Sequence, residues 1–128
     1  MKLISAVILN QTLGQISAAS ESTPRDFTVL VKLVVAENMR LSNPHAQDYE
    51  KLRVDLIKQY GEEDGPEKWT IKPESPNMAE FMSEMKKLSD SEVNTKFRRI
   101  YEKELKDAPL TIAQISVLQE AGIIVPNE

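Results

Sequence analysis

The sequence predicts a helix-dominated α+β fold, in which a long kinked central helix or a helical hairpin packs with a small antiparallel sheet. Two observations support this fold class. Apolar residues recur every three or four positions along most of the chain, and polar and apolar residues alternate around 68–72 and 93–99. The chain has 128 residues, of which 41% are hydrophobic and 28% charged, so we expect one globular domain covering residues 1–128.

The first expected element is an amphipathic helix over residues 3–19. Apolar side chains lie four apart at Ile4 and Ile8 and three apart at Leu13 and Ile16, which is helical spacing. Residues 1–4 would also fit a short strand ahead of the helix. The small and polar residues of 17–23 predict a loop.

A long central helix is expected from Pro24 to Tyr60, ended by Gly61. Thr23 is a suitable N-cap, and Pro24 suits the first position of a helix. The triplet Ser42-Asn43-Pro44 interrupts the pattern, because a residue before proline avoids helical backbone angles. The sequence therefore predicts one kinked helix or two nearly collinear helices.

Between the central helix and residue 90 we expect a short strand and a third helix. Trp69 and Ile71 alternate with polar residues over 68–72, which indicates a strand. Asn77 is the expected N-cap of a helix that runs to Leu88. The apolar residues on one face of that helix are Met78, Phe81, Met82, Met85 and Leu88. This stripe would be core or, if another chain covers it, an interface.

The remaining chain is expected to form a strand and a final helix. Residues 92–101 fit strand alternation and helical spacing equally well, and their strand propensity favours a strand paired with 68–72. Residues 111–122 predict the last helix. The side chains expected to point inward from it are Ile112, Ile115, Leu118 and Ile123.

The charge balance argues against a nucleic-acid binder. The net charge is −4, from 16 basic and 20 acidic residues. The one basic concentration is Lys96, Arg98, Arg99 and Lys103, interleaved with Phe97 and Tyr101. Basic and aromatic residues together can bind single-stranded nucleic acid, but the neighbouring glutamates dilute the positive field. We favour a charged strand edge or a partner contact for this cluster.

Two features bear on the cellular compartment. The absence of cysteine excludes disulfides and thiolate zinc sites. The apolar run at the N-terminus is short for a secretory leader, and no stretch approaches the ~20 apolar residues of a membrane-spanning helix. We therefore expect no membrane association.

The sequence contains no recognisable catalytic, cofactor-binding or metal site, and no small-molecule ligand is evident. His45 is the only histidine; Asp48 and Tyr49 could orient its ring, but a lone histidine completes no catalytic or metal-binding set. The acidic run 62–64 lacks the alternating acids of a calcium loop and predicts a solvated turn. The mixed charges of residues 48–58 indicate an exposed helical face. We expect a protein that is not an enzyme.

Three motifs resemble those of a group of small, mostly uncharacterised proteins of tailed bacteriophages. Residues 49–62 follow the pattern Y-x-x-x-R-x-x-L-I-x-x-Y-G-E, and residues 81–88 follow F-x-x-E-M-x-x-L, with Glu92-Val93 opening a strand. Residues 110–118 read L-T-x-x-Q-x-x-x-L. The Ser42-Asn43-Pro44 triplet departs from the unbroken helix of that group. The resemblance implies a phage origin and an α+β fold with a long helical hairpin and a small sheet, and it implies no catalytic residue.

The sequence thus predicts a non-enzymatic bacteriophage protein that acts through protein–protein contacts, as a virion structural or assembly component. Its partners would be other phage structural proteins or further copies of this chain, in the virion or the host cytoplasm. The alternative is a small phage-encoded regulator or inhibitor of a host protein, whose acidic residues at 62–64 would engage a basic partner.

Overall fold

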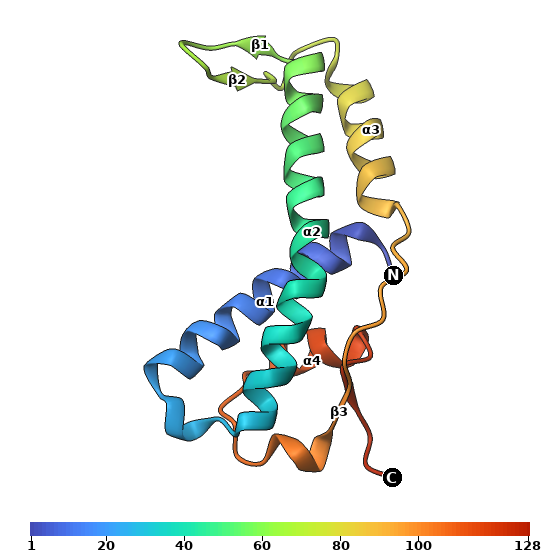
Figure 1. The fold of residues 1–128 in the computed structure, drawn as a ribbon. Coiled ribbons are helices and arrows are strands. Elements are labelled where there is room, and N and C mark those ends of the chain that lie inside the picture. The colour runs from blue at the N-terminus through green and yellow to red at the C-terminus, as the bar shows by residue number, and fades with distance from the viewer.

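A computed structural model describes all 128 residues and has the predicted α+β architecture, with four α-helices and two small sheets (Figure 1). The elements in chain order are α1 (Leu3–Ser22), η1 (Pro24–Asp26), α2 (Val29–Tyr60), β1 (Glu62–Glu63), β2 (Trp69–Thr70), α3 (Met78–Asp90), β3 (Ile100–Tyr101), η2 (Glu102–Leu105), α4 (Ile112–Glu120) and β4 (Ile124–Val125).

The chain is divided into two regions by the point where α1 crosses α2 (Figure 1). One region, called the body here, comprises residues 1–42 and 96–128. It contains α1, the first half of α2, α4 and the pair β3–β4. The other region, called the arm, comprises residues 43–95. It contains the second half of α2, the antiparallel α3 and the β1–β2 hairpin at the far end.

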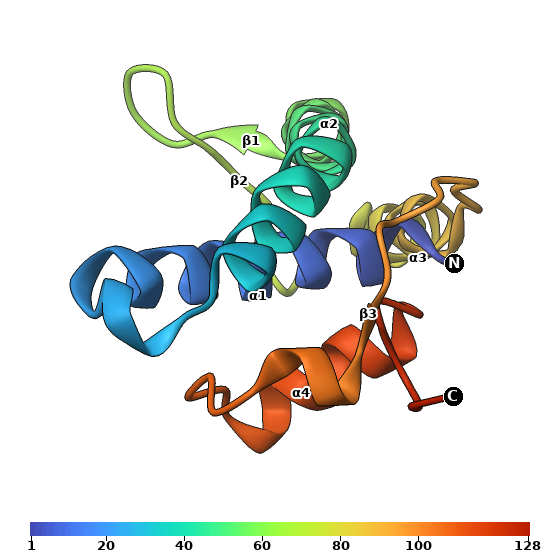
Figure 2. The same ribbon diagram turned by 60° about the horizontal axis from the view of Figure 1, so that its bottom comes forward.

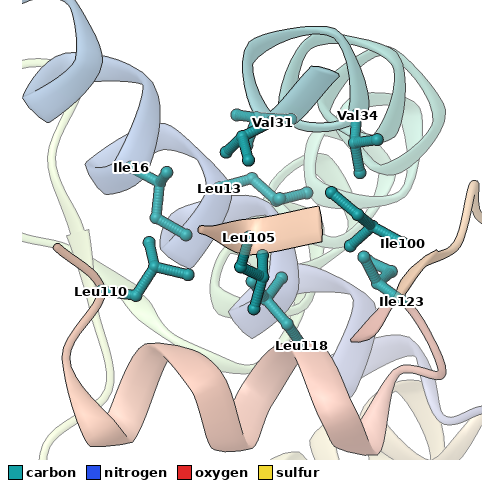
Figure 3. Close-up of a pocket in the computed structure, with 10 residues that line it drawn as sticks. Leu13, Ile16, Val31, Val34, Ile100, Leu105, Leu110, Leu118 and Ile123 are labelled. Atoms are coloured by element: carbon teal, nitrogen blue, oxygen red, sulfur yellow. The ribbon is translucent and has the colours of Figure 1, made fainter. Parts of the chain in front are cut away.

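The body contains the hydrophobic core. In Figure 2, α1 lies between α2 on one side and α4 on the other. The core side chains come from all of these elements and from the two strands (Figure 3). The buried members of the cluster are Leu9, Leu13, Ile16, Phe27, Val31, Val34, Val35, Ile100, Leu118, Ile123 and Ile124.

Helix α1 continues three residues beyond the predicted helix and removes the predicted loop at 17–23. It ends at Ser22, and the Thr23 hydroxyl donates a hydrogen bond to the Ala19 carbonyl at 3.1 Å. Alanines at 18 and 19 favour continued helix, which outweighs the small polar character of the segment. Thr23 therefore completes the end of α1 and does not cap the next helix.

Helix α2 begins later than predicted. Pro24 lies in the short 3₁₀ turn η1, and α2 starts at Val29. Thr28 is its N-cap, because the Thr28 hydroxyl accepts the Val31 N–H at 3.2 Å. Phe27, 4% exposed, packs into the core just before this cap and fixes where the helix enters the body.

Of the two forms predicted around Ser42-Asn43-Pro44, the structure has the single helix: α2 is continuous over 32 residues, with Pro44 inside it. Pro44 lacks an N–H and leaves the Arg40 carbonyl without its helical partner. Ser42 holds the helix just before that position. Its hydroxyl donates to the Met39 carbonyl at 3.3 Å and accepts from the Asn10 side chain on α1 at 2.9 Å.

The predicted end of α2 at Gly61 is confirmed, although the reason for glycine is space and not a left-handed backbone. Gly61 has φ −98°. A Cβ atom there would lie 2.5 Å from the carbonyl oxygens of both Ile57 and Thr70. Glycine therefore allows the hairpin to turn back against the end of the helix.

The strand predicted at 68–72 is present in shorter form, but its predicted partner is wrong. Trp69–Thr70 pairs antiparallel with Glu62–Glu63, so the acidic segment predicted as a solvated turn forms the opposite strand of a local hairpin. A hairpin within ten residues loses less chain entropy on closing than a pairing with 92–101.

Residues 92–101 are extended, as favoured over the helical alternative, and form regular strand only at Ile100–Tyr101. This strand pairs in parallel with Ile124–Val125. The buried Asn38 side chain holds Arg98, two residues before this strand, by accepting the Arg98 N–H at 2.8 Å and donating to the Arg98 carbonyl at 3.0 Å. One side chain thus takes the place of a neighbouring strand.

The last two helices lie close to their predicted positions. Helix α3 follows Asn77, whose side chain does not cap it and instead donates to the Tyr60 carbonyl at 3.3 Å. Helix α4 has a capping box between Thr111 and Gln114. Ile112 was expected to point inward, but it lies in the first turn and is 85% exposed.

Candidate interaction surface

The residues that the sequence offered as candidates for catalysis or metal binding lie apart from one another. They make structural contacts instead. His45 Nε2 lies 2.6 Å from the Thr95 hydroxyl and links α2 to the extended segment that follows α3. No hydrogen bond joins His45 to Asp48 or Tyr49. No group of three or more histidine, aspartate or glutamate side chains lies close enough to hold a metal ion.

Several of the charged side chains are paired on the surface. Arg53 donates two hydrogen bonds to Glu50, at 2.6 and 3.0 Å. This contact lowers the pKa of Glu50 and raises the pKa of Arg53. Asp48 and Asp55 are exposed on the same helix. The arrangement is the mixed, exposed helical face that the sequence predicted.

The basic residues at 96–103 lie along the edge of the body and are partly paired with acids. Arg98 binds both carboxylate oxygens of Glu37, at 2.9 and 3.0 Å. The Tyr101 hydroxyl donates to Glu128 at 2.6 Å, which raises the pKa of Tyr101. Lys103 lies 5.7 Å from the centre of the Tyr101 ring. These contacts neutralise part of the positive charge of the cluster.

A small void among the core side chains of the body is part of the core and is not a ligand site. It has a volume of about 10 Å³, and its ten lining residues are all hydrophobic (Figure 3). A volume this small is at the lower limit for a single water molecule, and no polar group is present to bind one. The void therefore reflects ordinary side-chain packing.

The arm differs from the body because it completely buries none of its side chains. Between Ser42 and Ile100 no residue is buried, although the segment is rich in apolar residues. The half-buried ones are Ala46, Tyr49, Val54, Leu56, Ile57, Tyr60, Ile71, Met78, Phe81, Met85, Leu88 and Val93. Three more are exposed: Leu52 is 44% exposed, Trp69 39% and Met82 62%.

These exposures confirm part of the apolar face that was predicted for α3. Four of the five residues predicted to share one face are half-buried, whereas Met82 is the exception. The stripe is thus neither a closed core nor a wholly free surface. It covers one side of α2 and leaves part of its apolar area uncovered.

A groove lies between the second half of α2, the hairpin and the start of α3. Figure 1 shows these parts of the chain meeting at the far end of the arm. The groove is called the tip groove here, and its lining residues are Ile57 of α2, Trp69, Thr70 and Ile71 at the hairpin, and Met78 and Phe81 of α3. Five of these six side chains are apolar. The sequence singled out most of these residues within separate elements, but only the local hairpin brings them together.

Local backbone contacts position the tip groove. The hairpin turn closes with the Asp64 N–H donating to the Lys68 carbonyl at 2.7 Å, and the turn contains Gly65 with φ +92°. Glycine adopts this left-handed angle without strain. The Asn77 bond to the Tyr60 carbonyl then joins the start of α3 to the end of α2.

The two regions also differ in charge. The arm carries twelve acidic and seven basic residues, whereas the body carries eight acidic and nine basic residues. The acidic excess is present around the tip groove. Six exposed carboxylates occur within residues 57–81: Glu62, Glu63, Asp64, Glu67, Glu74 and Glu80. The basic residues of the same segment are Lys58, Lys68 and Lys72, and Lys72 is paired with Glu62 at 3.8 Å.

Comparison with known proteins adds no family: no protein-family model, no curated protein and no solved structure matches this chain. The resemblance to tailed-phage proteins therefore stays a prediction. Among the helices, none is long and apolar enough to cross a membrane.

Proposed function

We propose that this protein is not an enzyme and acts through protein–protein contacts, with the arm as its docking region. The observation that carries this proposal is the contrast in burial along the chain. All 17 buried residues lie in the body, and the arm leaves its apolar side chains half-covered. Covering apolar area of this kind with another protein surface lowers the free energy, because it removes the area from water.

We further propose that the protein is a structural or assembly component of a bacteriophage virion. This step is supported by the motif resemblance at 49–62, 81–88 and 110–118. Two of these three motifs lie in the arm, the region in which no residue is fully buried.

Photo-crosslinking tests the contact role. A photoreactive amino acid is placed at Met82 in the arm, and in a matched variant at Ile112 in the body, which is still more exposed at 85%. We expect protein adducts from position 82 at several times the yield from position 112. Equal yields, or none from position 82, would contradict docking through the arm.

Mass spectrometry of purified particles tests the virion role. If the protein is a virion component, it is present at a constant ratio to the major capsid protein in successive preparations. A protein required for assembly but absent from particles would act before completion of the particle.

A regulator or inhibitor of a host protein is the second candidate, and the exposed acidic residues of the hairpin favour it. Charged surfaces of this kind accelerate binding to a basic partner. In that case the protein would be absent from particles, and the adducts from position 82 would contain a host protein.

A further inference from the structure

We infer that the tip groove binds a basic, amphipathic segment of a partner protein. An apolar side chain of the segment would lie beside Trp69, and its lysine or arginine side chains would face the surrounding carboxylates. The inference rests on the proposed contact role and adds the chemistry of the partner.

The apolar part of the argument comes from the lining of the groove. Ile57, Ile71, Met78 and Phe81 are half-buried, and Trp69 is 39% exposed. The large, rigid ring of tryptophan often supplies a major share of the binding free energy at a protein interface. A partner side chain of matching apolar character would cover this ring and exclude water from it.

The negative charge around the groove favours a positively charged partner. Six exposed carboxylates and three lysines occur within residues 57–81, and one lysine is already paired with Glu62. Basic side chains of a partner would gain from this field. Two arms placed tip to tip would bring like charges together, which argues against a second copy as the occupant of the groove.

The position of the groove makes it accessible and preformed. Figure 1 shows the hairpin at the end of α2 that is remote from the body. The bond from Asn77 to Tyr60 and the close approach of the chain at Gly61 hold the three elements together. A site formed before binding loses less conformational entropy when the partner binds.

Trp69 provides a direct assay because it is the only tryptophan in the chain. The probes are two synthetic amphipathic helical peptides of one length, one built from leucine and lysine and the other from leucine and glutamate. We expect the leucine–lysine peptide to shift Trp69 emission to shorter wavelength in a saturable manner. The leucine–glutamate peptide should leave the emission unchanged.

Charge-reversal variants locate the binding. The double substitution Glu63→Lys and Glu67→Lys should weaken binding of the leucine–lysine peptide at least tenfold. A matched control, Asp107→Lys with Glu120→Lys, makes the same change in net charge at exposed positions of the body and should alter affinity less than twofold. A third variant, Phe81→Ala, should weaken binding at unchanged charge, and circular dichroism checks that its helices are intact.

Three outcomes would overturn the inference. The first is absence of a Trp69 response to the leucine–lysine peptide, and the second is equal binding of both peptides. The third is a Trp69 shift that develops with protein concentration alone, together with a dimer in sedimentation, because a second copy would then occupy the groove. If crosslinks from Met82 persist in any of these cases, the proposed contact role stands and only the chemistry of the partner is wrong.

Discussion

Helix α2 passes through both regions and shows how they differ. Its first half buries Val31, Val34 and Val35 against α1 and the C-terminal elements, and it also buries the polar side chains of Asn38 and Ser42. Its second half packs with α3 and the hairpin and buries nothing completely. The same helix is thus surrounded on several sides in the body and covered mainly on one side in the arm.

This difference indicates how stability is distributed. The body has a closed core that excludes water, whereas the arm depends on contacts that water can reach. Regions with few buried apolar contacts open at lower free energy than the core does. Local opening of the arm would therefore leave the core of the body covered.

The largest effect is expected for a core truncation in the body. Leu13 is 0% exposed and packs among α2, α4 and β3 (Figure 3). Leu13→Ala should lower the free energy of unfolding by about 2–5 kcal/mol, because it removes buried methyl groups and leaves a cavity. Chemical denaturation measures the change. A loss below about 1 kcal/mol would show that the body is as loosely packed as the arm.

A smaller loss is expected at the boundary between the regions. Asn38 is 0% exposed, and both polar ends of its side chain bind the backbone of Arg98. Asn38→Ala should cost about 2–4 kcal/mol, because it leaves two backbone groups without their partner. The control is Asn43→Ala, an exposed asparagine five residues further along α2, which should change stability little. Equal effects of the two changes would exclude the contact between Asn38 and the Arg98 backbone as a source of stability.

The next effect should be confined to the arm. Gly61→Ala places a Cβ atom 2.5 Å from two backbone oxygens, so the hairpin must move away from the end of α2. We expect a loss of about 1–3 kcal/mol, a typical cost of overpacking. Hydrogen exchange should accelerate in the hairpin and at the start of α3. If exchange accelerates equally in α1, the two regions unfold as one unit.

Leu52 is the counterpart of Leu13 in the arm. Its side chain is 44% exposed, so Leu52→Ala should lower the stability of the free protein by less than about 1 kcal/mol. Denaturation of the two leucine variants side by side tests the comparison directly. A cost for Leu52→Ala that matches the cost for Leu13→Ala would mean that the arm contains a core of its own.

The sequence predicted most of the helical part of the fold because helical spacing is a local property. The ends of α3 and α4 and the end of α2 at Gly61 fall close to their expected positions. The error at Thr23 arose because Thr28 is an equally suitable cap five residues later, and only the burial of Phe27 decides between them. Local signals alone could not make that choice.

The strand pairings and the candidate surface were less predictable, since both depend on contacts between distant segments. The parallel pairing of Ile100 with Ile124 and the role of Asn38 require the body to be assembled first. For the tip groove, the available signal was a single tryptophan in an acidic segment between two apolar helices. That signal points to a candidate interaction surface, but it does not reveal which residues lie beside Trp69.

The smallest effect is expected at an ion pair that joins the two regions. Asp90 at the end of α3 binds Lys86 at 2.6 Å in the arm and Lys2 at 3.2 Å in the body. The contacts with Lys86 and then Lys2 lower the pKa of Asp90. Because the folded state holds this carboxylate ionised, the pair stabilises the protein at pH values above the usual aspartate pKa of about 3.9. The stabilisation is lost as pH falls through the lowered pKa of the folded state.

The substitution Asp90→Asn tests the direction of this pH dependence. The variant should be slightly less stable than the parent protein at neutral pH, and the difference should shrink as pH falls below about 4, where the unfolded carboxyl is protonated. Lys2→Met, which leaves the pair with Lys86 in place, separates the part that joins body and arm. If Lys2→Met reproduces the whole effect of Asp90→Asn, the ion pair acts by holding the arm to the body. If it reproduces none, Asp90 stabilises only the end of α3, and the two regions are joined there by the backbone contact between Leu3 and Ser91 at 2.7 Å.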